Sequence, residues 1–395
     1  MGKTRDFFSK KKGWSVLKDE IIGCYLTPYI NKILYTNRPL VIIDCFAGKG
    51  KFDDGNDGSP IIIGKHIKSV IDDVNRKNKV IYGIFIEKKY TEDLQRNLDG
   101  YRYCEVLKGK FDDYINKILN IDMDTNIFVY VDPYGIKNLN FKNFQRIKNK
   151  NFFSLELLMN LNSFGFLREG CRLLRYEDIQ FAEQNDFDDE YEIDETNSIE
   201  NMNMIADGDY WQEILLDKIN EKIDMLQAEE KFINSYIQQL KKLFKYVVNI
   251  PIKLKTKNIP KYRLIFGTNH EDGLILMSDE MNKAWKKILQ LDRKKQEVLF
   301  EYDFPDLTLY NGFNLEEDIL DIIKKSTDKS ILLKELIVQL IGKYGITFSQ
   351  RDFKNKLKEL NEKGLEIIWE PALTETGKKA TSMDYRKYKI IVRSE

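Results

Sequence analysis

The stretch IIDCFAGKG, residues 42 to 50, places a carboxylate and two glycines directly after a stiff apolar run. Asp44 ends the run, and Gly48 and Gly50 follow. Glycine has no Cβ, so the backbone of such a loop can lie close to a ligand. A tight turn between a strand and a helix is the plain alternative. The dinucleotide pattern G-x-G-x-x-G and the P-loop pattern that ends in Gly-Lys-Ser/Thr are both absent.

Two more apolar runs end in residues suited to chemistry. IFIE ends in Glu87, at the place where a carboxylate accepts hydrogen bonds from a ribose. NIFVYVDPYG ends in Asp132, Pro133 and Tyr134, which supply a carboxylate, a constrained carbonyl and a ring that can stack on a base. A strand cap followed by a turn is the alternative. We favour the functional interpretation, because independent parts should converge on one site.

Alternating strands and helices must position these residues. Near-continuous apolar runs predict strands in PLVIIDCF, KVIYGIFIE, RYCEVLKG and NIFVYVDP, and NFFSLELLMN is a fifth whose composition also suits a helix. Helical patterns lie between them, the first of which we expect to have Ser59 as N-cap and Pro60 as first residue. This alternation predicts a doubly wound α/β domain with a parallel sheet covered on both faces. Ligands bind such a sheet at the switch point, where Asp44 would lie.

The rest of the chain divides into further segments. A helical segment at 1–38 precedes the α/β domain at 39–296, which carries an acidic and helical insertion at about 176–245. We expect the acidic stretch 174–211 to be a mobile insertion or lid, followed by a long helical stretch from about 210 to 246. Two strands, KYVVNIPIKLK and KYRLIFGTN, then form a β-hairpin.

The C-terminal part, residues 314–395, has a different pattern. Three amphipathic helices and a hairpin made of LEIIWE and RKYKIIV predict a winged helix. Its third helix carries four basic residues, and we predict nucleic-acid contacts from three of them, Arg351, Lys354 and Lys358. An equal alternative is a solvated basic face on a module that forms a homodimer.

Composition restricts the class of protein. The 63 basic and 63 acidic residues balance, so whole-chain charge predicts no partner. The four cysteines form no CxxC pair, which argues against a zinc ribbon, an iron–sulfur cluster or a disulfide framework, and we predict no metal. No apolar run approaches the ~20 residues of a membrane span, and the start lacks the apolar core of a secretory signal. We therefore expect a cytoplasmic protein with no membrane partner.

Residues 44 to 50 resemble the D-x-F-A-G-x-G motif of class I S-adenosylmethionine-dependent methyltransferases. The resemblance implies a doubly wound, Rossmann-like sheet of seven strands that ends in a β-hairpin. It also implies that Glu87 holds the ribose and that the loop holds the methionine part of the cofactor, through Asp44, Phe46, Ala47, Gly48 and Gly50. The family usually has an acid or amide facing the adenine after the third strand. Here Lys110 stands there, so Asp112 is a displaced candidate and Phe111 a stacking partner.

The DPYG stretch resembles the D/N-P-P-Y/F signature of amino-methyltransferases that act on nucleobases, and is nearest to the D-P-F-G of tRNA guanine N2-dimethyltransferases. The resemblance implies that Asp132 and the carbonyl of Pro133 hold an exocyclic amine while Tyr134 stacks on its base. Cytosine C5-methyltransferases also carry FAG, but they need a Pro-Cys pair, and no cysteine here follows a proline.

Several stretches between about residues 7 and 285 together resemble the three-Cys-motif partner proteins. They include GWSVLKDEIIGCYLTPYI, IIDCFAGKGKFDDGNDGSP, YVDPYGIK and YRLIFGTNHEDGLILM. The resemblance implies a partner with three clustered cysteines that looks like a radical S-adenosylmethionine protein. Similar proteins occur near phage-related genes, which permits a role in phage defence or nucleic-acid modification.

Three hypotheses follow. The leading one is an S-adenosylmethionine-dependent methyltransferase acting on an amino group of a nucleic acid, DNA or RNA, with a base as acceptor. The second is a non-catalytic scaffold that delivers nucleic acid or protein to the three-cysteine enzyme. The third is a small-molecule methyltransferase whose winged helix forms a dimer.

Overall fold

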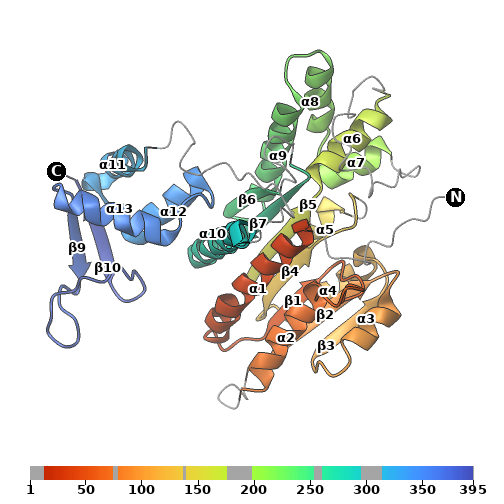
Figure 1. The fold of residues 1–395 in the computed structure, drawn as a ribbon, viewed down its shortest axis with the longest axis horizontal. Coiled ribbons are helices and arrows are strands. Elements are labelled where there is room, and N and C mark those ends of the chain that lie inside the picture. Colours follow the sequence, from red (N-terminus) through yellow and green to blue (C-terminus); the bar gives the residue numbers. More distant parts are fainter. Residues whose placement is uncertain are drawn as a thin grey trace.

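A seven-stranded sheet organises most of the chain (Figure 1). The computed structural model describes residues 13–73, 79–136, 139–175, 198–252, 260–294 and 314–394. The strands lie in the order β3-β2-β1-β4-β5-β7-β6, and all pairs are parallel except the two that β7 makes with β5 and β6. Their bounds are β1 Leu40–Asp44, β2 Ile81–Glu87, β3 Cys104–Lys108, β4 Asn126–Val131, β5 Ser154–Leu161, β6 Tyr246–Ile252 and β7 Tyr262–Thr268. This mixed sheet is consistent with the predicted Rossmann-like methyltransferase fold, and NFFSLELLMN is a strand.

Helices cover both faces because successive strand residues point to opposite sides. Leu40 and Ile42 of β1 join one apolar cluster, whereas Val41 and Ile43 join the other. The first face carries α1 Gly13–Leu34, α2 Ser59–Ile71, α3 Thr91–Asn97 and α10 Glu271–Lys294. The second face carries α4 Ile115–Leu119, α5 Phe141–Asn149, α6 Ser163–Leu173, α7 Ile199–Ala206, α8 Tyr210–Ile219 and α9 Met225–Lys241.

Helix α1 is part of the sheet domain. It packs against α10 and α2, and its Tyr25 and Tyr29 lie against Phe128 of β4. The hydroxyl of Tyr25 also donates a hydrogen bond to the buried Glu156 of β5. The helical segment expected at the N-terminus is therefore anchored by both apolar and polar contacts.

The insertion differs in part from the expected mobile lid. Residues 198–211, expected in that lid, form α7 and the start of α8, and Met202, Ile205 and Trp211 are fully buried or nearly so. The apolar residues of this segment recur at helical spacing and pack into the core despite its acidic composition. Residues 176–197 lie outside the described residues. The expected helical stretch after it consists of two helices, and Asp224 caps the second by accepting from the backbone N–H of Gln227.

The C-terminal part forms a separate group of elements, drawn in blue on the left of Figure 1. Its elements are α11 Leu315–Lys325, β8 Ser330–Leu332, α12 Leu333–Tyr344, α13 Gln350–Glu362, β9 Glu366–Glu370 and β10 Lys389–Arg393. The strands pair antiparallel in the order β8-β10-β9, so β8 is added to the expected hairpin. Helix α10 joins this group to the sheet domain, since Asn282 donates to the carbonyl of Ile346 at 2.8 Å. None of the described helices has the length and apolarity needed to cross a membrane.

Because the carboxyl of Glu156 is buried, we expect the free energy of unfolding to depend on pH. Burial raises its pKa from 4.5 to about 7. A pKa that is higher in the folded than in the unfolded state stabilises the fold below about pH 4.5, and this stabilisation is lost as pH rises through about 7. The neutral isostere Glu156→Gln should therefore be more stable than wild type at pH 8, by on the order of 2 kcal/mol, and about equal at pH 4.5.

Urea unfolding between pH 4.5 and 8 tests this expectation. The control is Glu105→Gln, which removes a half-exposed carboxylate paired with Lys117 on the surface. Parallel pH profiles for wild type and Glu156→Gln would contradict the assignment.

Candidate functional site

Three carboxylates gather where the strand order of the sheet reverses. Strand β1 pairs with both β2 and β4, so Asp44 at its end lies beside the ends of both neighbours. Glu87 ends β2, and Asp132 directly follows β4. Burial is the main cause of the raised pKa of Asp44, and the nearby carboxylates of Asp132 and Glu87 raise it further. This is the switch point at which open α/β sheets bind ligands.

Asp44 shapes the loop from inside. It is fully buried, and its two oxygens accept hydrogen bonds from the backbone N–H of Phe46 at 3.1 Å and the hydroxyl of Ser59 at 2.7 Å. Burial raises the pKa of Asp44 to about 7, although both hydrogen bonds oppose that shift. The expectation that Ser59 is an N-cap was wrong. Gly58 occupies the cap position, and the Ser59 hydroxyl bonds to Asp44 instead of to the helix backbone.

The side chain of Glu87 accepts a hydrogen bond from the backbone of the glycine loop. Gly48 N–H donates to Oε2 of Glu87 at 2.8 Å, while Oε1 accepts from the N–H groups of Lys89 and Tyr90 at 2.6 and 3.0 Å. An ionised carboxylate has about four acceptor positions, so roughly one remains for a ribose hydroxyl. Gly48 and Gly50 both have positive φ, at 65° and 81°, a conformation that favours glycine.

The adenine side of the site differs from expectation. Phe111 is fully buried and packs against Phe46 and Phe144, with ring centroids 6.4 and 6.0 Å away. A fully buried ring has no face free to stack on adenine, so Phe111 belongs to the core beneath the loop. Asp112 is exposed and accepts a hydrogen bond from Asn143 at 2.5 Å, so it is accessible to a ligand.

Asp132, whose side chain is 23% exposed, is the centre of a partly buried polar network. Lys18 of α1 places its Nζ 2.8 Å from Oδ1 and 2.7 Å from Oδ2. Asn160 of β5 donates to Oδ1 at 2.8 Å, and the Tyr130 hydroxyl donates to Oδ2 at 3.2 Å. These four hydrogen bonds fill the acceptor positions of the carboxylate. The expected direct contact between Asp132 and a substrate amine is therefore not available in this arrangement.

The two other residues of the DPYG stretch lie differently. Pro133 is buried, whereas the side chain of Tyr134 is 51% exposed. Tyr134 is therefore half-exposed beside the switch point, and its role in stacking on a base stays a prediction.

Sequence reasoning missed Lys18 and Asn160. Lys18 is 114 positions from Asp132 in the chain, and only 7% of its side chain is exposed. A signal was present, because Lys18 lies on the same helical stripe as Ile21, Ile22 and Tyr25, all of which are buried. A lysine on a core stripe requires a buried anionic partner, and the ends of the strands supply one.

Neither a metal-binding group of side chains nor a sequence relative identifies the function of this site. Across the described ranges, no three or more His, Cys, Asp or Glu side chains are arranged to hold a metal ion. No family model matches the chain, and no curated protein matches it. Membership of the three-Cys-motif partner family therefore stays a prediction.

Three solved structures are among those similar to this chain. A conserved hypothetical protein of Streptococcus pyogenes has 16% identity and a TM-score of 0.21, covering 32% of this chain and 69% of its own. A DUF519 protein of Legionella pneumophila str. Philadelphia 1 has 10% identity and a TM-score of 0.39, covering 71% and 92%. The plantazolicin methyltransferase BamL, in complex with a substrate analogue and SAH, has 11% identity and a TM-score of 0.30, covering 65% and 85%.

These TM-scores are low, so the class of protein rests on the sheet and the site. The strand order is consistent with a Rossmann-like methyltransferase fold, and three carboxylates meet at its switch point.

The pair of Lys18 and Asp132 predicts a large coupling energy. Removing one partner of a buried ion pair leaves a charge without compensation and costs roughly 3–5 kcal/mol. We expect Lys18→Met and Asp132→Asn each to lower the free energy of unfolding. The double variant should lose less than the sum of the two, with a coupling of at least about 1 kcal/mol.

A double-mutant cycle in urea measures this coupling. The exposed pair of Lys117 and Glu105 is the matched control, and its coupling should stay below about 1 kcal/mol. Equal coupling in the two cycles would show that the buried pair has no special role.

Proposed function

We propose that this protein is an S-adenosylmethionine-dependent methyltransferase that acts on an amino group of a nucleic acid, with a base as acceptor. The observation that carries the proposal is the meeting of Asp44, Glu87 and Asp132 at the switch point of a sheet with this strand order. Carboxylates at these strand ends suit a ligand that carries both hydroxyl groups and positive charge.

The loop residues fit such a cofactor. The backbone from Phe46 through Ala47, Gly48 and Gly50 would lie against the methionine part, with Asp44 fixing the loop from below. Glu87 has one acceptor position for a ribose hydroxyl, and Asp112 is accessible for the adenine. When bound, S-adenosylmethionine supplies an electrophilic methyl group on a sulfonium ion.

On the acceptor side, the protein works by positioning. Methyl transfer needs an in-line approach and a free lone pair on the amine, more than a strong base. The half-exposed Tyr134 would stack on the base, and the carbonyl of Pro133 would accept from the amine. Asp132 acts on the acceptor through the groups that it orients, Lys18 and Asn160.

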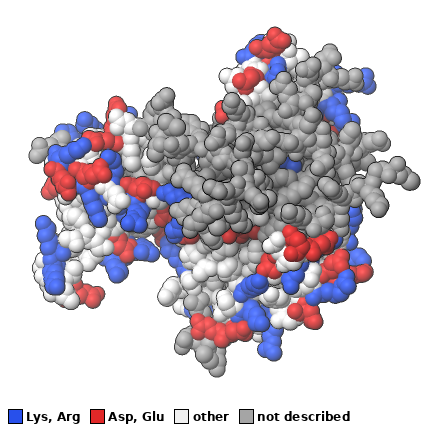
Figure 2. Space-filling view, in the orientation of Figure 1, with Lys and Arg blue, Asp and Glu red and all other residues white. Residues whose placement is uncertain are grey.

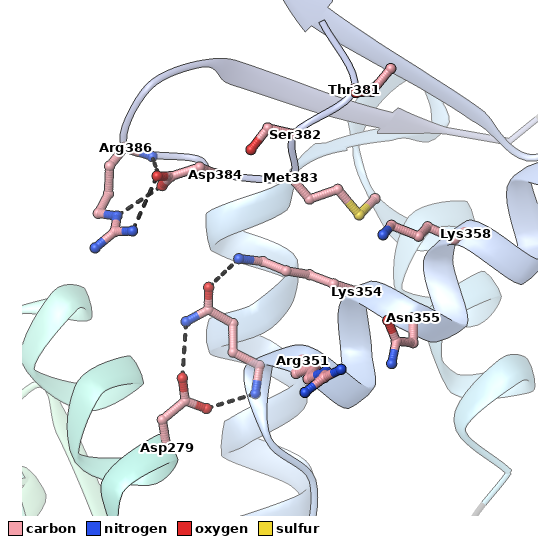
Figure 3. Close-up of a pocket in the computed structure, with 11 residues that line it drawn as sticks. Asp279, Arg351, Lys354, Asn355, Lys358, Thr381, Ser382, Met383, Asp384 and Arg386 are labelled. Atoms are coloured by element: carbon pink, nitrogen blue, oxygen red, sulfur yellow. Dashed lines mark hydrogen bonds and ion pairs between the residues drawn. The ribbon is translucent and has the colours of Figure 1, made fainter.

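We further propose that residues 314–394 form a winged helix that binds the nucleic-acid backbone. The order of helix, strand, two helices and two strands supports this class. Arg351, Lys354 and Lys358 project from α13 into an open pocket of ≈ 540 Å³, bounded by the segment from Thr381 to Arg386 (Figure 3). Basic and acidic residues are interspersed over this domain in Figure 2, so binding would be local to the pocket.

A non-catalytic role is the second candidate, and the filled acceptor positions of Asp132 favour it. In that case the domain would be a scaffold for nucleic acid or for a protein with three clustered cysteines that looks like a radical S-adenosylmethionine enzyme. A role in phage defence would fit either candidate.

Calorimetric titration with S-adenosylhomocysteine tests the cofactor site. Burial raises the pKa of Asp44 to about 7, and the positively charged amino group of S-adenosylhomocysteine favours the ionised carboxylate. Affinity should therefore rise by about tenfold from pH 6 to pH 8, as the carboxyl loses its proton. Asp44→Asn should bind more weakly and show no such rise, and a flat titration of wild type at millimolar ligand would exclude the enzyme.

Methyl transfer to nucleic acid tests the activity. Wild-type protein with S-adenosylmethionine labelled in the methyl group should label DNA or RNA, and digestion followed by mass spectrometry should find the label on an exocyclic amine. Cofactor binding without any label would favour the scaffold.

Salt dependence tests the C-terminal surface. Each phosphate contact contributes about 0.9 to the slope of log affinity against log salt for duplex DNA. Arg351→Gln with Lys358→Gln should therefore reduce the slope by roughly 2. Lys356→Gln is the control, because Lys356 lies on the same helix and pairs with Glu359. An unchanged slope in the double variant would exclude this surface as the binding face.

A further inference from the structure

The network around Asp132 contains one unused donor and one unused acceptor. An ammonium group has three N–H bonds, and Lys18 directs two of them to the oxygens of Asp132. No oxygen or nitrogen atom within the described part of the chain accepts from the third, and Nζ lies 5.4 Å from the centroid of the Tyr262 ring. The side-chain oxygen of Asn160 is also without a hydrogen-bond partner there, although the residue is only 1% exposed.

The two residues meet at one atom. Nζ of Lys18 and Nδ2 of Asn160 both lie 2.8 Å from Oδ1 of Asp132. Because an ionised carboxylate can only accept, this contact fixes the Asn160 amide with its nitrogen toward Asp132 and leaves its oxygen as the free acceptor. Asp132 thus orients the residue with the donor and the residue with the acceptor through the same oxygen.

Buried polar groups in proteins are almost always satisfied, and exceptions call for a ligand or water that completes them. The ligand that would complete this pair must present an acceptor and a donor on adjacent positions. The amidine edge of an amino-bearing nucleobase does so, with an exocyclic N–H next to a ring nitrogen, as in adenine, cytosine and guanine.

We propose that Lys18 and Asn160 read the amidine edge of the acceptor base. The third N–H of Lys18 donates to the ring nitrogen, and the side-chain oxygen of Asn160 accepts from the exocyclic amine. This holds one amine N–H and fixes the rotation of the amino group. The inference rests on the proposed function for the identity of its ligand, and it assigns direct contact to these two residues in place of Asp132.

The first test measures binding without turnover. Adenosine, cytidine and guanosine are titrated into the full chain with S-adenosylhomocysteine present, next to purine riboside, which keeps the ring nitrogens and lacks the amino group. At least one of the three nucleosides should bind, and purine riboside should bind at least tenfold more weakly than the best of them. Equal binding of purine riboside, or no binding by any of the three, would overturn the proposal.

Variants assign the contacts. Lys18→Met and Asn160→Leu should each weaken nucleoside binding by at least tenfold and leave S-adenosylhomocysteine affinity unchanged, which also reports that the variant is folded. Lys261→Met is the matched control, because Lys261 is also buried and lies 5.4 Å from the same Tyr262 ring as Lys18 does. Loss in the control equal to that in Lys18→Met, or wild-type binding by Asn160→Leu, would overturn the proposal.

The readouts separate this inference from the proposed function. Nucleoside binding that depends on both residues, without methyl transfer to any nucleic acid, would support the contacts and reject the enzyme. Methyl transfer with an unchanged acceptor KM in both variants would support the enzyme and reject the contacts.

Discussion

The ion pair between Lys18 and Asp132 is the interaction on which the site depends. Lys18 is on the N-terminal helix and Asp132 follows a central strand, so the pair ties α1 to the switch point of the sheet. Neither charge is stable in a largely buried position without the other. Two turns further along the same helix, the hydroxyl of Tyr25 donates a hydrogen bond to Glu156 of the adjacent strand. Two polar contacts at positions that share one helix face thus fix α1 over the sheet, and the apolar contacts between them exclude water.

At the glycine loop too, carboxylates expected to contact a ligand already make hydrogen bonds within the protein. Asp44 accepts from the backbone N–H of Phe46 and the hydroxyl of Ser59, and Glu87 accepts from three backbone N–H groups. The loop is therefore shaped before any ligand arrives. A pre-shaped loop lowers the entropy lost on binding, and it leaves few polar positions for the ligand itself. Specific recognition then falls to the positions that the fold leaves unfilled.

Helix α10 connects this site to the C-terminal domain. Its Asp279 accepts from the backbone N–H of Gln350 at 2.7 Å, and its first turn pairs with Lys334 through Glu271 and Asp272. Because these contacts anchor the start of α13 and of α12, the basic face of α13 is presented at a fixed position relative to α10. Under the proposed function, a nucleic acid bound at α13 would be held at a defined position relative to the sheet domain, as in a tethered binding module.

From the sequence alone one can predict the alternation of strands and helices, the hairpin at the edge of the sheet and the carboxylates at the strand ends. Hydrophobic periodicity and turn residues are local, so these features can be recognised within short windows. The hydrogen bonds that each carboxylate makes depend on the completed fold. The partners come from remote segments, 114 positions away for Lys18 and 28 for Asn160, and no local pattern encodes such a pairing. The burial of Phe111 and the packing of α7 against the core could not be predicted for the same reason. Burial depends on which residues the completed fold places around a side chain.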